Sequence, residues 1–443
     1  MKHSSSLGQN TRRHNSTAHS GTTFEIRDRE LTQTLEKDDN VETVVMRVLT
    51  PLVAEPKPVP TPAILLAMLR VSSKVSDLIL SPGSFPMVEL SGKLTPVKIS
   101  GMPPLTPEDT LRIAHELIDG NKQASESLEN LGSCDISYRV PGQCRFRVNI
   151  FHQRGSHAIV MRVIPQVIPT LVDLNLPRQL AELADLQNGI VLVTGPTGSG
   201  KSSTLAAVLD RINDTHAYHI LTIEDPIEFM HRHKRSIVHQ RELHSDTPSF
   251  ALALRAALRQ APKIILVGEM RDKETIEIAL EAAETGHLVL STLHTIDASK
   301  TVERIIGAFP MGEQHTIRNR LAKSFRAIIS QRLIPRKDGS GRVAIVEILK
   351  STLRTREYVE KGEQDGKTLL EAMTDGDTDG MQYFDGEIEK LVRAGIVDIG
   401  TGLAYATNPG NLRLLLTDMG NAPTHNSDAI ADQLATPSAT TSN

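Results

Sequence analysis

Residues 195–203, GPTGSGKSS, constrain the fold of this chain more than any other segment. They match the phosphate-binding loop pattern G-x-x-x-x-G-K-[ST]. The apolar run before them, residues 189–194, predicts a buried strand, and the Ala- and Leu-rich run after them predicts a helix. In this arrangement glycines let successive backbone N–H groups turn toward a phosphate, and the helix N-terminus adds partial positive charge. The segment therefore predicts a nucleotide-binding α/β domain.

Two residues of the loop have specific expected roles. Lys201 reaches the terminal phosphates of the nucleotide, and Ser202 is a ligand of Mg²⁺. The predicted nucleotide-binding residues are Gly195, Pro196, Thr197, Gly198, Ser199, Gly200, Lys201, Ser202 and Ser203.

Apolar strand runs alternate with helical segments throughout residues 178–350. The expected strands are GIVLVTG, HILTIED, KIILVGE and HLVLSTL. The helical segments between them are SSTLAAVLDRIND, SFALALRAALRQA and KETIEIALEAAE. Unbroken apolar strands with intervening helices are typical of a parallel sheet covered on both faces. The predicted fold class of this block is α/β.

Two glutamates follow the expected strands at the edge where parallel sheets bind ligands. Glu269 ends KIILVGE, and Glu228 lies just beyond HILTIED. A carboxylate at this edge can hold Mg²⁺, or can orient and deprotonate the attacking water. We therefore expect both glutamates to be catalytic, with Glu269 and Ser202 at the metal. The pattern leaves open how the two carboxylates divide these duties.

Two histidines flank the apolar run LVLSTL. Seven positions of a strand would separate His287 and His294 by roughly 23 Å and turn their rings to opposite faces. A shared metal ion is thus excluded. His294 lies at the edge with Lys201 and Glu269, where it can contact the γ-phosphate or the attacking water. His287 lies at the other end, where packing is the alternative to a functional role.

Arginines are also expected, because a cationic side chain stabilises the transition state of phosphoryl transfer. The candidates near the carboxylates are Arg255, Arg259 and Arg271. Arg145 and Arg147 share one face of an alternating strand, and Arg162 lies in the same predicted hairpin. We treat these three as candidates for contacting a nucleotide held by a neighbouring subunit. A solvated strand edge is the alternative interpretation.

Composition changes along the chain predict further segments. Residues 1–58, rich in Ser, Thr and His and ending in a proline-rich stretch, predict a disordered arm and linker. Residues 59–170 predict a small α+β domain that ends in a hairpin. Residues 351–420 predict a helical region, and residues 421–443 a disordered tail.

Charge and composition argue against several functional classes. The chain has 49 Lys and Arg against 53 Asp and Glu, a net charge of -4, so no basic field recruits nucleic acid or an anionic membrane. Its apolar runs are shorter than the ~20 residues of a membrane span. Two cysteines suit a reducing cytoplasm. The expected loop with His231, His233, His239 and His244 lacks a zinc-binding pattern.

Four segments occur in order: GPTGSGKSSTLAAVLD, ILTIEDPIEF, LRAALRQAPKIILVGEMRDKETIEIALEAAETGHLVLSTLHT and ISQRLI. Together they resemble the PilT-type pilus retraction ATPases of the type II/IV secretion ATPase superfamily. SDLILSPGSFPMVELSGKL and RFRVNIFHQRG in the first domain resemble the family too. The resemblance covers residues 60–395.

The resemblance implies a PAS-like N-terminal domain, a RecA-like ATPase domain and a homohexameric ring with ATP and Mg²⁺ between subunits. It also implies a motor for pilus disassembly and twitching motility, in the cytoplasm at the inner membrane, where it acts on the platform protein of the pilus machine. Glu228 matches the Asp-box glutamate of the family and Glu269 its Walker B glutamate. His287 and His294 match its His box.

One departure from the family affects the direction of the motor. Where retraction ATPases carry a segment like AIRNLIRE, residues 353–360 read LRTREYVE, so the sequence supports ATP hydrolysis better than retraction. The alternatives are a pilus assembly or type II secretion ATPase, a RecA-like nucleic-acid translocase and a non-hydrolysing scaffold. Two cysteines cannot supply the tetracysteine zinc module of assembly enzymes. Aromatic content of 3% and the negative net charge disfavour the translocase, and the two glutamates disfavour the scaffold.

Overall fold

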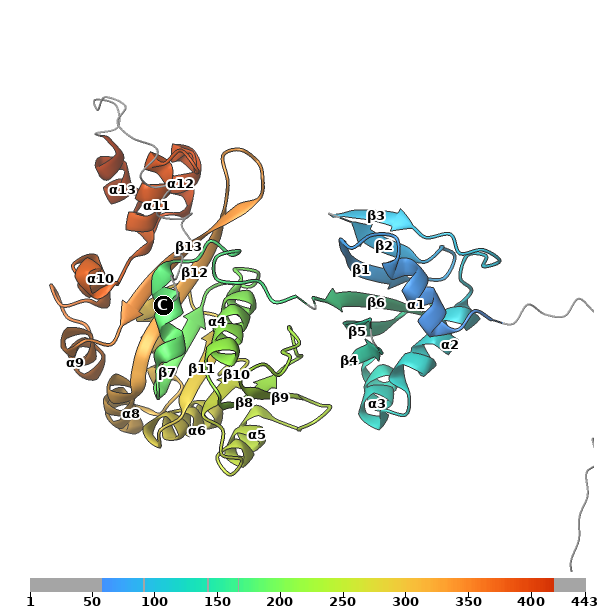
Figure 1. The fold of residues 1–443 in the computed structure, drawn as a ribbon, viewed down its shortest axis with the longest axis horizontal. Coiled ribbons are helices and arrows are strands. Elements are labelled where there is room, and N and C mark those ends of the chain that lie inside the picture. Colours follow the sequence, from blue (N-terminus) through green and yellow to red (C-terminus); the bar gives the residue numbers. More distant parts are fainter. Residues whose placement is uncertain (1–57, 91, 142, 166, 418–443) are drawn as a thin grey trace, which may run out of the picture. The chain divides into compact units, whose positions relative to one another are not determined.

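The computed structural model describes residues 58–417 of the 443-residue chain, apart from residues 91, 142 and 166. Within this range two sheets each carry their own helices (Figure 1). The predicted N-terminal arm, except its last residue, and the predicted C-terminal tail lie outside the described residues. No helix in the described range is long and apolar enough to cross a membrane.

The first domain has a six-stranded antiparallel sheet in the order β3-β2-β1-β6-β5-β4. Its elements are α1 (Thr61–Leu69), β1 (Val75–Leu80), β2 (Met87–Leu90), β3 (Lys93–Pro96), α2 (Pro107–Ile118), α3 (Lys122–Leu131), β4 (Ser133–Val140), β5 (Cys144–Gln153) and β6 (Ser156–Ile164). Phe146, Val148 and Ile150 of β5 are buried in the core, so the alternating Arg145 and Arg147 take the other face. The α+β content matches the prediction, whereas the likeness to a PAS domain stays a prediction.

The second sheet has seven strands in the order β13-β12-β7-β11-β10-β8-β9. Its strands are β7 (Gly189–Thr194), β8 (His219–Glu224), β9 (Ile237–Glu242), β10 (Ile264–Val267), β11 (Leu288–Leu293), β12 (Phe325–Pro335) and β13 (Arg342–Lys350). All neighbours pair in parallel except β12 and β13, which form an antiparallel hairpin. The predicted parallel α/β sheet is therefore confirmed.

Helices cover both faces of this sheet, as β7 illustrates. Ile190 and Leu192 join one hydrophobic cluster, and Val191 and Val193 join another, because alternate side chains of a strand point to opposite faces. The first cluster includes α5 (Phe250–Ala257), α6 (Lys273–Glu284), α7 (Ala298–Gly307) and α8 (Met311–Ser324). The second includes the 3-10 helix η1 (Arg178–Asp185) and α4 (Lys201–Thr215). A strand buried on both faces reads as an unbroken apolar run.

Two local expectations were wrong. The segment with His239 was expected to be a loop, but it contains β9, the edge strand beside β8. Only one side of an edge strand is paired, so β9 mixes polar and apolar residues and lacks the apolar signal of the inner strands. In addition, α5 ends at Ala257, short of the expected helical run.

Short helices follow the hairpin in the region predicted to be helical. They are α9 (Leu353–Lys361), α10 (Leu369–Thr374), the 3-10 helix η2 (Asp377–Asp379), α11 (Phe384–Arg393), α12 (Ile399–Tyr405) and α13 (Pro409–Leu416). Phe384 and Ile388 of α11 pack with Ile334 and Ile345 of the hairpin in a separate cluster. The helical region is thus anchored to the edge of the ATPase sheet opposite β9.

Candidate active site

The phosphate-binding loop connects the end of β7 to the start of α4 and lies against β12. Gly195 has a φ of 143° and Gly200 a φ of 93°, backbone conformations that favour glycine. A Cβ at Gly195 would overlap the carbonyl oxygen of Gln331, and a Cβ at Gly200 would lie 2.8 Å from Gln331 Nε2. The loop can therefore pack this closely on β12 only with glycine at both positions.

Lys201 is buried at the first position of α4. Its Nζ donates hydrogen bonds to the carbonyl oxygens of Gly195 at 2.9 Å and Pro196 at 3.0 Å. Burial lowers the pKa of this ammonium group, and the nearby Glu269 carboxylate opposes that effect. Ser202 is exposed in the same helical turn, and the buried Ser199 Oγ has no hydrogen-bond partner within the described residues. The hydroxyl groups of Ser199 and Ser202 are thus available to donate hydrogen bonds to a ligand.

Glu269 lies two residues beyond the end of β10. Its side chain is 12% exposed, and one oxygen forms a 2.5 Å ion pair with the exposed Arg271. The other oxygen, Oε2, is buried without a hydrogen-bond partner in the described part of the chain. It lies 3.6 Å from Nε2 of His294. This oxygen is therefore free to bind a water or a metal-bound water.

The two histidines lie at opposite ends of β11, as the sequence predicted. The side chain of His294 is 48% exposed beside Glu269. Burial lowers the pKa of His294 and the Lys201 charge lowers it further, whereas Glu269 opposes the shift. A neutral imidazole at neutral pH follows, able both to donate and to accept. His287 instead donates from Nδ1 to the carbonyl oxygen of Ala282 in α6, at 2.9 Å.

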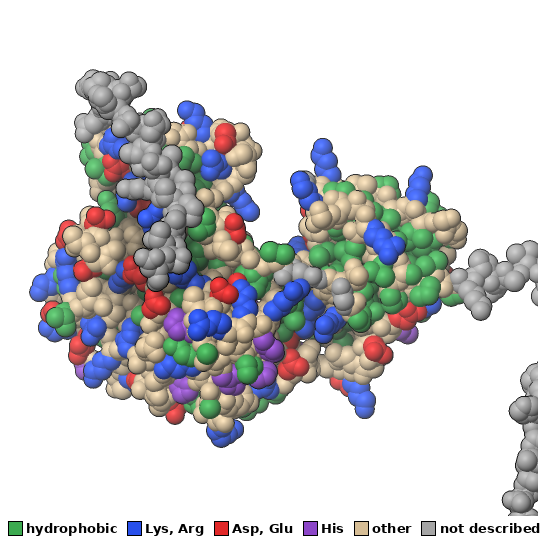
Figure 2. Space-filling model, in the orientation of Figure 1, with side chains coloured by type: hydrophobic (Ala, Val, Ile, Leu, Met, Phe, Trp, Pro, Cys, Tyr) green, Lys and Arg blue, Asp and Glu red, His purple; other side chains and the backbone are tan. Residues whose placement is uncertain are grey.

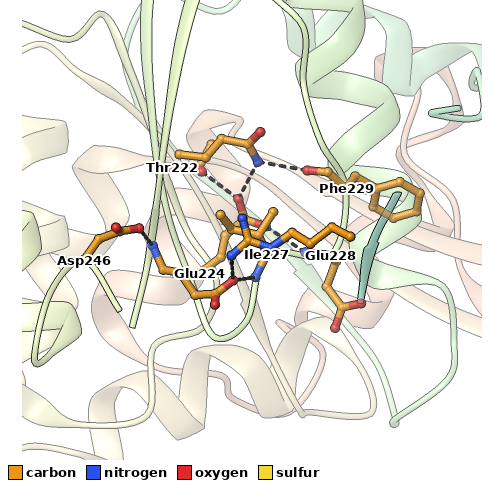
Figure 3. Close-up of polar contacts among 9 residues, drawn as sticks. Thr222, Glu224, Ile227, Glu228, Phe229 and Asp246 are labelled. Atoms are coloured by element: carbon orange, nitrogen blue, oxygen red, sulfur yellow. Dashed lines mark hydrogen bonds and ion pairs between the residues drawn. The ribbon is translucent and has the colours of Figure 1, made fainter. Parts of the chain in front are cut away.

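Glu224 at the end of β8 holds the turn that carries Glu228 (Figure 3). Its Oε1 accepts from the Thr222 hydroxyl at 2.6 Å and from Gln240 Nε2 at 3.1 Å. Its Oε2 accepts from the backbone N–H of Glu228 at 3.3 Å. Burial raises the pKa of Glu224, and these hydrogen bonds oppose the rise. The Glu228 side chain itself is exposed.

The sequence places Glu224 among the acids at the end of this strand, but we chose only Glu228 of that group as a catalytic candidate. One local signal existed: Thr222 lies two positions earlier, on the same face of β8, where its hydroxyl can reach the carboxylate. The other partner, Gln240, comes from the unexpected strand β9. The sequence therefore indicated only part of the hydrogen bonding of Glu224.

The three candidate inter-subunit arginines differ in their contacts. Arg145 Nη2 forms a 2.7 Å ion pair with Glu242, and Arg162 Nε forms a 2.9 Å ion pair with Asp77. Arg147 is exposed and lies opposite Arg162 in the pairing of β5 with β6. Within the described residues, Arg147 is the one of the three that forms no ion pair, so its charge is the most available to a phosphate.

Histidine side chains gather on the surface of the ATPase domain near β8 and β9 (Figure 2). His219 Nε2 and His239 Nδ1 lie 2.9 Å apart, and the rings of His233 and His239 have centroids 6.2 Å apart. Within the described residues, no three His, Cys, Asp or Glu side chains are placed to hold one metal ion. We interpret this cluster as hydrogen-bonded surface packing.

Comparison with known proteins identifies the family. A model of the type II/IV secretion system protein family matches residues 133–374. The type IV pilus retraction ATPase PilT of Pseudomonas aeruginosa is 43% identical over 346 residues, which are 78% of this chain and 98% of PilT. This chain belongs to the PilT-type ATPases. The type IV pilus ATPase PilU of the same organism is 38% identical, over 79% of this chain and 90% of PilU.

Solved structures of similar ATPases agree with the fold. A crystal structure of the pilus retraction motor PilT with bound ADP is 40% identical, with a TM-score of 0.73, and covers 81% of this chain and 100% of that one. The ATPase DotB of Legionella pneumophila is 30% identical, with a TM-score of 0.68, over 82% and 97% of the two chains. This PilT-type chain therefore has the predicted RecA-like ATPase fold and is a P-loop ATPase.

Proposed function

We propose that this chain is the ATP-hydrolysing motor of type IV pilus retraction. It works as a homohexamer in the cytoplasm, at the inner membrane, and acts on the platform protein of the pilus machine. The observation that carries ATP hydrolysis is the buried Oε2 of Glu269, which has no hydrogen-bond partner among the residues that the structure describes. It lies beside His294, at the sheet edge where Lys201 also lies. Similarity over 98% of the length of PilT supports retraction as the task.

In the proposed mechanism, backbone N–H groups of the loop and Lys201 bind the phosphates of ATP. Lys201 exchanges its two loop carbonyls for phosphate oxygens. Glu269 Oε2 accepts a hydrogen bond from the attacking water and then its proton. His294, neutral at this edge, donates to a γ-phosphate oxygen or orients the same water.

The residues present fit Mg²⁺. Ser202 offers an exposed hydroxyl in the first turn of α4, and Glu269 offers an oxygen, without a partner in the described residues, that can accept a hydrogen bond from a metal-bound water. These are oxygen ligands of the kind that Mg²⁺ takes in nucleotide sites. When bound there, the ion neutralises negative charge on the β- and γ-phosphate oxygens.

The remaining predicted residues act beside the site or away from it. Glu228, on the turn fixed by Glu224, orients the water or holds a metal-bound water. His287 acts in contacts between subunits rather than in ATP binding. Arg145, Arg147 and Arg162 are candidates for the nucleotide of a neighbouring subunit, a role in which Arg145 must exchange Glu242 for a phosphate.

Purified Lys201→Ala protein tests the site. We expect its ATPase turnover to fall to background, because the terminal phosphates lose their cation. The control is Lys273→Ala, which removes a partly exposed lysine that pairs with Glu313 outside the site, and which should keep normal turnover. Wild-type turnover in the Lys201→Ala protein would refute the site assignment.

Deletion of the gene in its host, followed by imaging of surface pili, tests the direction of the motor. Excess pili that do not retract, restored by the wild-type gene but not by Lys201→Ala, are the expected result. A cell without pili would instead indicate an assembly ATPase and would overturn retraction while leaving the ATPase assignment intact.

A further inference from the structure

A row of polar side chains crosses the sheet directly behind the phosphate-binding loop. Thr194 ends β7, Ser330 lies opposite it on β12, and Glu347 lies opposite Ser330 on β13. Their exposures are 0%, 0% and 3%. The Thr194 hydroxyl donates to Ser330 Oγ at 3.1 Å. Ser330 pairs with Glu347 across the hairpin, and its hydroxyl opposes the rise in the pKa of the Glu347 carboxylate. The base of the loop is thus linked to the edge of the sheet through a row of buried polar side chains.

The row ends on the helix that follows His294. Glu347 Oε1 accepts a hydrogen bond of 2.8 Å from the backbone N–H of Ala298, the first residue of α7. A helix N-terminus leaves such N–H groups without intrahelical partners, and a carboxylate is a favourable acceptor for them. Only three residues separate His294 from Ala298, so Glu347 fixes the end of the segment that carries the histidine.

A second line of hydrogen bonds returns from α7 to the loop. The hydroxyls of Thr301 and Thr295 are 2.7 Å apart, and Thr295 directly follows His294. Thr301 Oγ1 also lies 3.5 Å from Thr194 Oγ1. The segment from His294 to α7 is therefore tied to the end of β7 at two points, once through Thr301 and once through Ser330 and Glu347.

The neighbouring residue of β12 contacts the other side of the loop. Gln331 Oε1 accepts from the Thr204 hydroxyl of α4 at 2.7 Å, and its Nε2 lies against Gly200. Because alternate strand residues face opposite sides, Ser330 points toward α7 while Gln331 points toward α4. These contacts give Ser330 and Gln331 of the segment ISQRLI a structural role that the sequence alone did not predict.

We propose that Glu347 and Ser330 are positioning residues for ATP hydrolysis, which hold His294 at a fixed place relative to the phosphate-binding loop. The inference rests on the active site proposed above. It assigns no chemical step to either residue, since both act through the α7 N-terminus and Thr194.

Packing alone does not explain a carboxylate at this position. Burial raises the pKa of Glu347 to about 7, while the Ala298 N–H and Arg332 oppose the rise and Asp297 adds to it. An apolar side chain of similar size would avoid the cost of burying this group. What an apolar side chain cannot supply is the acceptor for Ala298.

The test measures kcat and KM for ATP in Glu347→Leu and Glu347→Gln, each alone and combined with His294→Ala. Leucine removes the acceptor, so we expect kcat to fall roughly tenfold to a hundredfold, as for misplaced groups, with KM changed less than about twofold. Glutamine keeps a carbonyl acceptor for Ala298 and should recover most of the turnover. In the His294→Ala background, the leucine substitution should cause no further loss.

An equal loss from Glu347→Leu in both backgrounds would overturn the proposal, because the effect would then not pass through His294. If Glu347→Leu fails to fold, Ser330→Ala removes one hydroxyl and should lower kcat a few-fold, again only while His294 is present. Ile348→Val is the control, since it trims a buried neighbour of Glu347 outside the polar row. A normal Glu347→Leu enzyme beside an inactive Lys201→Ala enzyme would reject this inference alone, whereas an active Lys201→Ala enzyme would reject the site.

Discussion

The ends of β8 and β10 carry glutamates on neighbouring parallel strands, yet their surroundings differ. Glu224 accepts hydrogen bonds from two side chains and one backbone N–H. Glu269 has one ion pair with an exposed arginine and a buried oxygen without a partner in the described residues. The comparison separates a carboxylate that holds the backbone from one that remains available to substrate.

The energetic cost of leaving a buried oxygen of Glu269 without a partner in the described residues supports this distinction. A buried polar atom without a partner costs about 1–3 kcal/mol, so such atoms in native proteins call for an explanation. Next to Lys201 and His294, a role in binding water is the explanation that the chemistry supports. Glu224, with its acceptors occupied, has little capacity left for substrate.

The largest expected effect comes from Glu269→Gln. We expect kcat to fall by about 10²–10⁴, the range for losing a general base, because the amide cannot take a proton from water. Binding of a fluorescent ADP analogue and the melting temperature should stay near wild type, since the substitution preserves shape. Turnover within tenfold of wild type would remove the contrast between the two strand ends.

A third carboxylate, that of Glu347, can be compared with these two through the pH dependence of folding stability. Its pKa rises from 4.5 to about 7 in the folded protein, so the native state holds a proton that the unfolded chain releases. The stability that this group contributes is full below pH 4.5 and is lost as pH rises through about 7. Relative to Glu347→Gln, which cannot ionise, wild type should lose roughly 3 kcal/mol across this window.

Urea unfolding of both proteins at intervals between pH 5 and about pH 8 measures this difference. The glutamine variant keeps every other titrating group, so the difference between the two proteins at each pH reports the ionisation of Glu347. Parallel stability curves for the two proteins would show that Glu347 does not change its proton affinity on folding.

Glu224→Gln should mainly affect stability. Its amide turns an NH₂ group toward donors that need an acceptor, so we expect a loss of about 1–3 kcal/mol and a kcat reduced less than tenfold through the turn of Glu228. Thr222→Val is the matched variant, because it removes one donor and keeps the carboxylate. Thermal unfolding and ATPase assays on both variants measure the two effects, and a Glu224→Gln enzyme as inactive as Glu269→Gln would reverse the assignment.

We expect Glu228→Gln to lower kcat only about tenfold, below the range of about 10²–10⁴ for losing a general base. Its carboxylate is exposed and has no buried oxygen of the kind found in Glu269. Steady-state ATPase assays of the two glutamine variants side by side decide between them. A larger loss at Glu228 would make it the base and leave Glu269 to the metal.

Much of the ATPase fold was readable from sequence because the inner strands are buried on both faces. β7, β8, β10 and β11 appeared as apolar runs, and the glycine pattern identified the loop between β7 and α4. The edge strand β9 was missed, since four polar residues follow its two apolar ones and the strand has no apolar run. At the site, Lys201, Glu269 and His294 were foreseen to gather, because parallel strands end at one edge of the sheet.

The sequence by itself determined the nucleotide loop, the α/β class and the separation of His287 from His294. All three depend on local spacing, which a linear pattern records. Only the tertiary structure decided which glutamate has its hydrogen-bond acceptors occupied. It also placed Thr194, Ser330 and Glu347 in one row behind the loop. Thr194 comes from a strand far along the chain from the hairpin that carries Ser330 and Glu347, and only the register of the folded sheet brings the polar atoms together.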